Sequence, residues 1–214
     1  MYALSDRECW NIDAERSSLT FSLRHALLGQ IRGEFRCWGG RVLIDSRARS
    51  QPAVHVWVDL ASLDTGSRRR DKSILDTELF DVQWQPSLVF DSERLEYTDD
   101  GLAVLTGWLG LNSLRKEISL EVTFSRPPGD GAAGFVATAR AAIDRRAFGL
   151  RREANARDWL SERFVDRTIE MVAQVVITPP APAAFPAKSA SRPAGRAPGP
   201  FTLIARSEPR PVTT

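Results

Sequence analysis

The two-residue alternation of apolar and polar side chains is the feature that most constrains this chain. It returns in short segments, as in Ala53–Leu60, where Val54, Val56, Val58 and Leu60 share one face. Such alternation is typical of strands with one buried face, and it predicts about eight antiparallel strands. The segments that carry it are 10–12, 19–25, 31–38, 42–44, 53–60, 87–90, 102–111, 117–124, 135–143 and 164–177.

Turn residues separate these segments. Asp100–Gly101 is a strong hairpin signal, Asn112–Lys116 predicts a second turn, and the polar run Asp13–Ser18 is expected to end the first strand. Gly33 in mid-strand indicates a sharp bend or a close backbone approach, and Gly39–Gly40 predicts a bulge. Antiparallel strands at hairpin spacing remove their edges by closing into a barrel, and about eight strands leave room for one small ligand.

One stretch, Leu63–Val82, departs from the alternation. A helical wheel places Ile74, Leu75, Leu79 and Phe80 on one side, away from the charged residues before them, and Asp64 or Thr65 could cap the start. We therefore expect a short amphipathic helix that covers one open end of the barrel. The strand Phe135–Ile143 alternates with alanines, and small inward residues leave space inside a barrel.

The composition changes after Pro179. The last residues are dominated by Pro, Ala, Arg and Ser without periodicity, so they cannot bury enough apolar surface to order themselves. We predict a barrel domain over residues 1–178 and a disordered tail over 179–214. Within the tail, Phe201–Ile204 is an apolar island that is either chance or a segment that folds back onto the domain or a partner.

The charge balance and the first residues argue against several classes of protein. The formal net charge is +2, which argues against a nucleic-acid binder because such proteins need a concentrated basic surface. No apolar run is long enough to predict a transmembrane helix, and the first ten residues have no signal-peptide pattern, so the default expectation is a cytoplasmic location.

Catalytic and metal-binding motifs are missing from the sequence. We find no nucleophile elbow, phosphate-binding loop, zinc-protease motif or paired-cysteine motif, so no cofactor or metal is expected. Cys9 and Cys37 could form one disulfide, but Cys37 is better explained as a small buried side chain in a strand. A site made of His25, Cys37 and a carboxylate is conceivable, since both lie on inward phases, but no ligand spacing supports it.

Several polar residues near the predicted rim have two interpretations. His25 either anchors the turn that follows it or meets the head group of a ligand at the cavity mouth. Arg70 and Asp71 form either a local ion pair or a fixed pair that holds the helix to the rim. Arg145 and Arg167 are either rim ion pairs or phosphate binders.

Separated motifs of this chain resemble the YceI-like polyisoprenoid-binding family. They are WNID, SSLTFSLRHALLGQIRGEF, SLDTGSRRRDKSILDTELFDVQWQPSLVFDS, GWLGLNSLRKEISLEVTF and AAIDRRAFGL, in the family's order from Trp10 to Ile177. The hairpin departs from the family's Thr-Lys-Pro run by carrying Glu117 in place of the proline, which alters a turn only.

The resemblance implies a lipocalin-like eight-stranded barrel whose apolar cavity holds an isoprenoid chain. It also implies possible homodimers. From strand phase and the resemblance we predict these ligand-binding residues: Phe21, Leu23, His25, Phe35, Val56, Val58, Arg70, Asp71, Leu75, Leu79, Phe80, Phe90, Leu109, Leu120, Val122, Ala139 and Met171.

Three functions are compatible with this sequence. The first is a non-enzymatic carrier or store of an isoprenoid lipid or isoprenoid quinone. The second is an enzyme that acts on a small apolar or lipid substrate, with His25 as acid or base. The third is an interaction module, in which the barrel is a scaffold and the tail binds a partner.

Overall fold

The computed structural model describes residues 7–45, 51–75, 86–127, 134–150 and 165–180. All of them belong to one compact unit, Met1–Pro180. Residues 181–214 of the predicted tail and the predicted site residues Leu79 and Phe80 lie outside the described residues.

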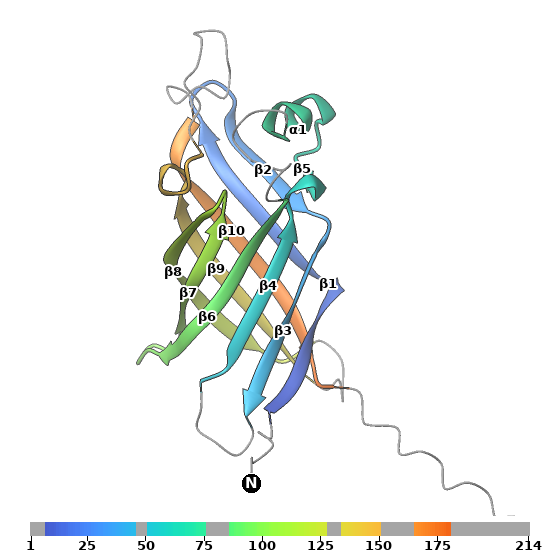
Figure 1. The fold of residues 1–214 in the computed structure, drawn as a ribbon, viewed down its shortest axis with the longest axis vertical. Helices are drawn as coiled ribbons and strands as arrows, with labels where there is room; N and C mark the ends of the chain where they lie inside the picture. The colour runs from blue at the N-terminus through green and yellow to red at the C-terminus, as the bar shows by residue number, and fades with distance from the viewer. Residues whose placement is uncertain (1–6, 46–50, 76–85, 128–133, 151–164, 181–214) are drawn as a thin grey trace, which may run out of the picture. The chain divides into compact units, whose positions relative to one another are not determined.

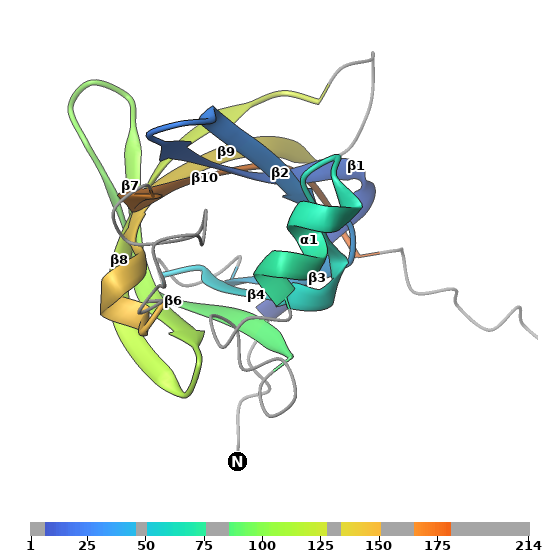
Figure 2. The ribbon, with the colours of Figure 1, turned by 90° about the horizontal axis from the view of Figure 1, so that it is seen from above.

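Eight antiparallel strands form a closed barrel, as the sequence predicts (Figures 1 and 2). The ring order is β10-β9-β8-β7-β6-β4-β3-β1, and β1 pairs again with β10. The elements are β1 (Arg7–His25), β2 (Gly29–Phe35), β3 (Trp38–Asp45), β4 (Ala53–Asp59), η1 (Leu60–Ser62), β5 (Leu63–Asp64), α1 (Arg68–Leu75), β6 (Ser87–Tyr97), β7 (Ala103–Leu111), β8 (Leu114–Ser125), β9 (Phe135–Asp144), η2 (Arg145–Phe148) and β10 (Val165–Thr178). β2 and β5 extend the wall beyond β1 at the end near α1.

The first strand is longer than predicted. Asp13–Ser18 does not end it, because β1 continues from Arg7 to His25 through a bulge against β10. Asp13 lies opposite Val176 and Ser18 lies opposite Gln174, so four residues of β1 face a single residue of β10. The bulge changes the side-chain phase of the strand, and for this reason Ile12 and Leu19 both face the interior.

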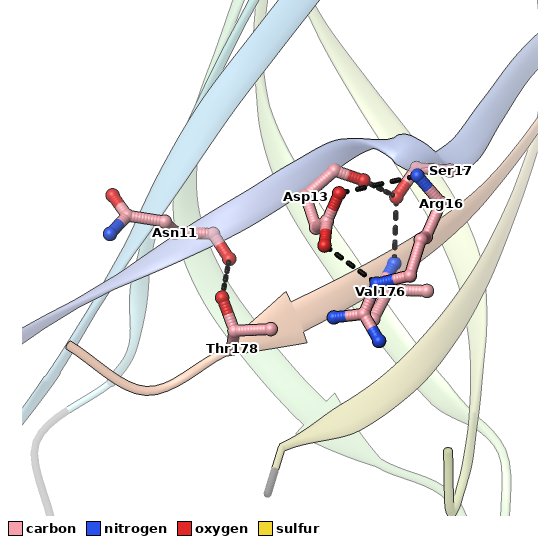
Figure 3. Close-up of polar contacts among 6 residues, drawn as sticks. All are labelled: Asn11, Asp13, Arg16, Ser17, Val176 and Thr178. Carbon is pink, nitrogen blue, oxygen red and sulfur yellow. Dashed lines mark hydrogen bonds and ion pairs between the residues drawn. The ribbon is translucent and has the colours of Figure 1, made fainter. Parts of the chain in front are cut away.

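Short polar contacts hold the bulge together (Figure 3). The Arg16 guanidinium donates to the Asp13 carboxylate at 2.6 Å and lowers the pKa of that carboxyl. The Ser17 hydroxyl donates to the Asp13 carbonyl at 2.5 Å and accepts from the backbone N–H of Val176 at 2.8 Å. Ser17 therefore provides the acceptor that the missing ladder bond would have given Val176.

Two features of the chain after Phe35 differ from the sequence prediction. The chain bends at Arg36 and Cys37, because the Cys37 carbonyl accepts from the N–H of Asp59 at 2.9 Å. Cys37 is consequently exposed, so its prediction as a buried side chain is wrong. Gly39–Gly40 is not a bulge: both residues pair regularly with β4, where a Cβ on Gly40 would lie 2.5 Å from the His55 carbonyl oxygen.

The glycine in mid-strand has the predicted role. A Cβ on Gly33 would lie 2.5 Å from the ring of Phe21, on the neighbouring strand β1. The missing side chain lets the Phe21 ring lie over β2 and contact Phe35, with 5.4 Å between ring centroids. The close approach inferred from the sequence is therefore confirmed.

The hairpin turns also follow local chemistry. The Thr98–Leu102 turn joins β6 and β7 with Gly101 at φ 82°, as the Asp-Gly signal predicts. β8 begins earlier than expected because Asn112 and Ser113 alone form the second turn, with φ values of 50° and 60°. Positive φ at both central residues is the geometry of a tight two-residue hairpin.

α1 lies at the end of the barrel that β2 and β5 extend (Figures 1 and 2). Ile74 is buried and Leu75 half-buried in the core, while Arg68, Arg69 and Lys72 are exposed, as the amphipathic pattern predicts. With eight residues, α1 is the longest helix in the described part of the chain. No helix among these residues is long and apolar enough to cross a bilayer.

We predict that Ser17→Ala lowers the free energy of unfolding by about 1–3 kcal/mol, because the N–H of Val176 loses its acceptor where β1 closes on β10. Urea denaturation measures the change. Ser18→Ala is the matched control, since Ser18 is exposed, and it should change the stability by less than about 0.5 kcal/mol. Equal effects of the two substitutions would contradict the role given to Ser17.

Candidate functional site

A cavity of 670 Å³ occupies the inside of the barrel. Every strand of the ring contributes to its wall. The lining residues are Ile12, Leu19, Val42, Ile44, Gln51, Pro52, Val54, Val56, Val58, Leu88, Phe90, Leu95, Tyr97, Leu105, Leu109, Ile118, Leu120, Val122, Phe124, Phe135, Ala137, Ala139, Ala141, Ile143, Met171, Ala173, Val175 and Ile177. The volume is within the range of sites that enclose most of a small ligand.

The chemistry of this wall is almost purely apolar. Among the described lining residues, only Gln51 and Tyr97 carry polar side-chain atoms, and none is charged at neutral pH. Gln51 lies two residues before the start of β4 and Tyr97 ends β6, so both lie at the end of the barrel opposite α1. Dispersion and desolvation are therefore the forces that a ligand would meet along most of the cavity.

Alanines on two neighbouring strands create the space. Ala139 and Ala141 of β9 lie opposite Ala173 and Met171 of β10, and all four line the cavity. These side chains point inward yet are only half-buried, because they face open volume instead of packed atoms. The prediction that small inward residues leave space in the barrel is confirmed.

A second cavity of about 100 Å³ lies at the α1 end. It is lined by Phe21, Leu23, Phe35, Leu60, Leu63, Ile74, Leu88, Leu109, Leu111, Ile143, Arg145, Leu150, Val165, Ile169 and Met171. Leu88, Leu109, Ile143 and Met171 line both cavities, so the two adjoin there.

The structure places most of the predicted apolar site residues on these walls. Val56, Val58, Phe90, Leu109, Leu120, Val122, Ala139 and Met171 line the large cavity. Phe21, Leu23 and Phe35 line the small one. Leu75 packs against the core without lining either cavity.

Arg70 and Asp71 do not line either cavity, and both bond to Thr65. The Thr65 hydroxyl donates to the Asp71 carboxylate at 2.5 Å and accepts from Nε of Arg70 at 2.7 Å. The backbone completes the clamp: the N–H of Thr65 donates to Asp71 at 2.9 Å, and its carbonyl accepts from Arg70 at 2.8 Å. Thr65 follows β5, so the two residues hold α1 to the barrel wall, which is one of the two roles considered for them.

His25 anchors a turn. Its side chain is buried, and Nδ1 accepts from the backbone N–H groups of Leu27 and Leu28, both at 3.1 Å. Nδ1 must be unprotonated to accept these bonds. His25 lines neither cavity, so the turn-anchoring interpretation describes its position better than contact with a head group. Because Cys37 is exposed, the two residues do not share an inward face as the conceivable metal site required.

Arg145 is buried at the α1 end. Its guanidinium donates to the carbonyls of Leu150 and Asp166 at 2.8 Å and of Val165 at 3.1 Å, which ties η2 to the start of β10. Gly149, in the left-handed conformation with φ 70°, ends η2 and turns the chain so that Leu150 lies in reach.

Arg167 forms the rim ion pair that was one of its two predicted roles. Its guanidinium donates to the Asp144 carboxylate at 2.5 and 2.9 Å. This hydrogen bond and the charge of Arg167 lower the pKa of Asp144, and the same contact raises that of Arg167. Asp144 also accepts from the N–H of Arg146, where η2 begins.

Sequence reasoning missed the aromatic residues at the end opposite α1. Tyr97, Phe124 and Phe135 line the cavity there, and Tyr97 is 73% exposed. Their rings form a row with Trp10, with centroids 5.8–6.5 Å apart along it. The alternation does place Phe124 and Phe135 on inward phases, but only the closure of the sheet shows that they surround an opening. We call Gln51, Tyr97, Phe124 and Phe135 the mouth of the cavity.

A closed antiparallel barrel around an apolar cavity is a lipocalin-like architecture. The chain matches the YceI-like domain over residues 10–177 and belongs to that family. A UPF0312 protein of Vibrio parahaemolyticus is 30% identical over 128 residues, 58% of this chain and 68% of that protein. Protein YceI of Salmonella newport is 28% identical over 129 residues, 58% of this chain and 67% of that protein.

Solved structures with little sequence identity share the fold. BcnA of Burkholderia cenocepacia has a TM-score of 0.65 and 18% identity, and the match covers 77% of this chain and 98% of that one. A polyisoprenoid-binding domain of Saccharophagus degradans, implicated in plant cell wall breakdown, has a TM-score of 0.59 and 17% identity, with 80% and 98% covered.

We predict that Ala139→Phe fills part of the cavity. The free energy of unfolding should stay level or rise by up to about 2 kcal/mol, because the ring enters apolar space that is already open. Uptake of the apolar dye N-phenylnaphthylamine, followed by fluorescence, should weaken about tenfold, the equivalent of two buried CH₂ groups. Ala142→Phe on the outer face of β9 is the control and should leave uptake unchanged. A large loss of stability in Ala139→Phe would contradict an open cavity at this position.

We also predict that Asp144→Asn makes the free energy of unfolding depend less on pH in acid. The folded pKa of Asp144 lies below its ordinary value of 3.8, so its carboxylate contributes stability above pH 3.8 that is lost as the pH falls through the lowered pKa. Urea unfolding of both proteins from neutral pH to below pH 3.8 should show the difference between them shrinking in acid. Arg167→Gln should have the same effect, and parallel profiles of wild type and Asp144→Asn would contradict the assignment.

Proposed function

We propose that this protein binds an isoprenoid lipid or isoprenoid quinone in the barrel and carries or stores it without catalysis. The observation that carries the proposal is the cavity of 670 Å³ with an apolar wall and a mouth at one end. The family to which the chain belongs and the similarity of its fold to a polyisoprenoid-binding domain support the same ligand class.

The energetics of such a ligand fit this wall. Each buried CH₂ contributes about 0.8 kcal/mol, so a five-carbon isoprene unit contributes roughly 3–4 kcal/mol before the cost of ordering the chain. A few units give tight binding without any polar contact. Methyl branches make a prenyl chain wider than a straight acyl chain, and Ala139, Ala141 and Ala173 leave that width along one side.

The polar end of the ligand lies at the mouth in this proposal. Gln51 and Tyr97 offer an amide and a hydroxyl there, whereas the remaining described wall offers no hydrogen-bonding side chain. Burying a head group deeper would leave its polar atoms without partners, which is unfavourable.

The lack of catalysis is supported by where the titratable side chains lie. His25, the acid or base of the enzymatic alternative, is buried outside both cavities with Nδ1 bonded to two backbone N–H groups. No observation on the described residues favours the enzymatic alternative over binding alone.

Organic extraction of the purified protein, followed by mass spectrometry, tests the proposal. We expect a prenyl lipid in the extract, or saturable uptake of a polyprenol by delipidated protein. Deletion of residues 179–214 should leave uptake unchanged, because the last strand of the apolar wall, β10, ends at Thr178. A protein that is empty and also takes up neither polyprenols nor prenylquinones would overturn the proposal.

A further inference from the structure

The lining residues of β9 and β10 follow the same order between the mouth and α1. On β10, the series Ile177, Val175, Ala173 and Met171 lines the large cavity, and Met171 and Ile169 line the small one. On β9, the wall runs in the same direction from Phe135 to Ile143, where both cavities meet. The two cavities are therefore arranged in series along the barrel axis.

Four side chains line both cavities at the place where the two adjoin. Leu88 of β6, Leu109 of β7, Ile143 of β9 and Met171 of β10 line both of them. Leu88, Leu109 and Ile143 are at least nine-tenths buried, whereas Met171 is only partly buried. Met171 is thus the least buried of the four.

The neighbours of Met171 differ on its two sides. On β9 it lies opposite Ala141, which leaves space, and on β1 it lies opposite Phe21, whose ring covers Gly33 and helps to fill the barrel beyond. Met171 lies between the part of the wall lined by Ala139, Ala141 and Ala173 and the aromatic packing at the α1 end. An unbranched thioether side chain can change rotamer there without moving the backbone.

We infer that Met171 sets the longest prenyl chain that the cavity accepts, with the head group at the mouth and the chain end against the four shared side chains. This inference rests on the proposed function. A chain longer than the large cavity must displace Met171 or leave an isoprene unit outside in water. Losing the burial of one isoprene unit weakens binding by a factor on the order of 10².

Competition among prenols graded in length by single isoprene units tests the inference. Delipidated protein is incubated with an equimolar mixture, and the bound fraction is extracted and quantified by mass spectrometry. The most enriched chain should be one unit shorter in Met171→Trp than in wild type. It should be one unit longer in Met171→Ala, because the additional 100 Å³ becomes reachable.

Gln174→Trp is the matched control, since Gln174 lies on β10 with its exposed side chain on the outer face. It should leave the length distribution of wild type unchanged. Met171→Leu nearly keeps the side-chain volume, so it should shift the length distribution less than either the Trp or the Ala substitution. It also shows whether the fold tolerates a change at this position.

The possible outcomes separate the inference from the proposed function. Wild-type protein that binds no prenol would overturn the proposed function. Wild-type protein that binds prenols, with the same preferred length in folded Met171→Trp and Met171→Ala, would overturn the inference alone. A head group found beside Arg145 by photocrosslinking from the polar end would likewise overturn it, because the chain would then enter in the opposite direction.

Discussion

The closure of β1 on β10 is the constraint on which the rest of the structure depends. These strands lie at opposite ends of the domain sequence, and their pairing turns an open sheet into a barrel. Closure requires β1 to keep its apolar side chains inward over its whole length, although it pairs with β3 in its first half and with β2 in its second. The bulge at Asp13–Ser18 makes this possible because it changes the phase of the strand between the two halves.

Much of the fold could be predicted from the sequence because it depends on local periodicity. The inward phases of β4, β8 and β9, the need for glycine at position 33 and the space beside Ala139 all follow from side-chain alternation and residue size. The bulges and the bend at Cys37 could not be predicted in this way. They depend on bonds between distant residues, such as that from Val176 to Ser17 or from Asp59 to the Cys37 carbonyl.

The candidate site, too, could be predicted only in part from the sequence. Strand phase predicts Val56, Leu120 and Met171 on the cavity wall, but it carries no information on which end of the barrel is open. The helical stretch suggested an opening beneath α1. In the structure, the Thr65 clamp fastens that helix, and the exposed aromatic residues surround the opposite end. α1 is thus fastened to one side of the barrel at the end opposite the mouth.

The small inward side chains Ala139, Ala141 and Ala173 have a consequence for the stability of the empty barrel. A core that is left partly open lacks the dispersion contacts that a filled interior provides, so a bound chain completes the packing of the folded state. Ligand that binds only the folded protein adds a stability that grows with the logarithm of its free concentration. Under the proposed function, occupied molecules would therefore be more stable than empty ones and more resistant to proteolysis.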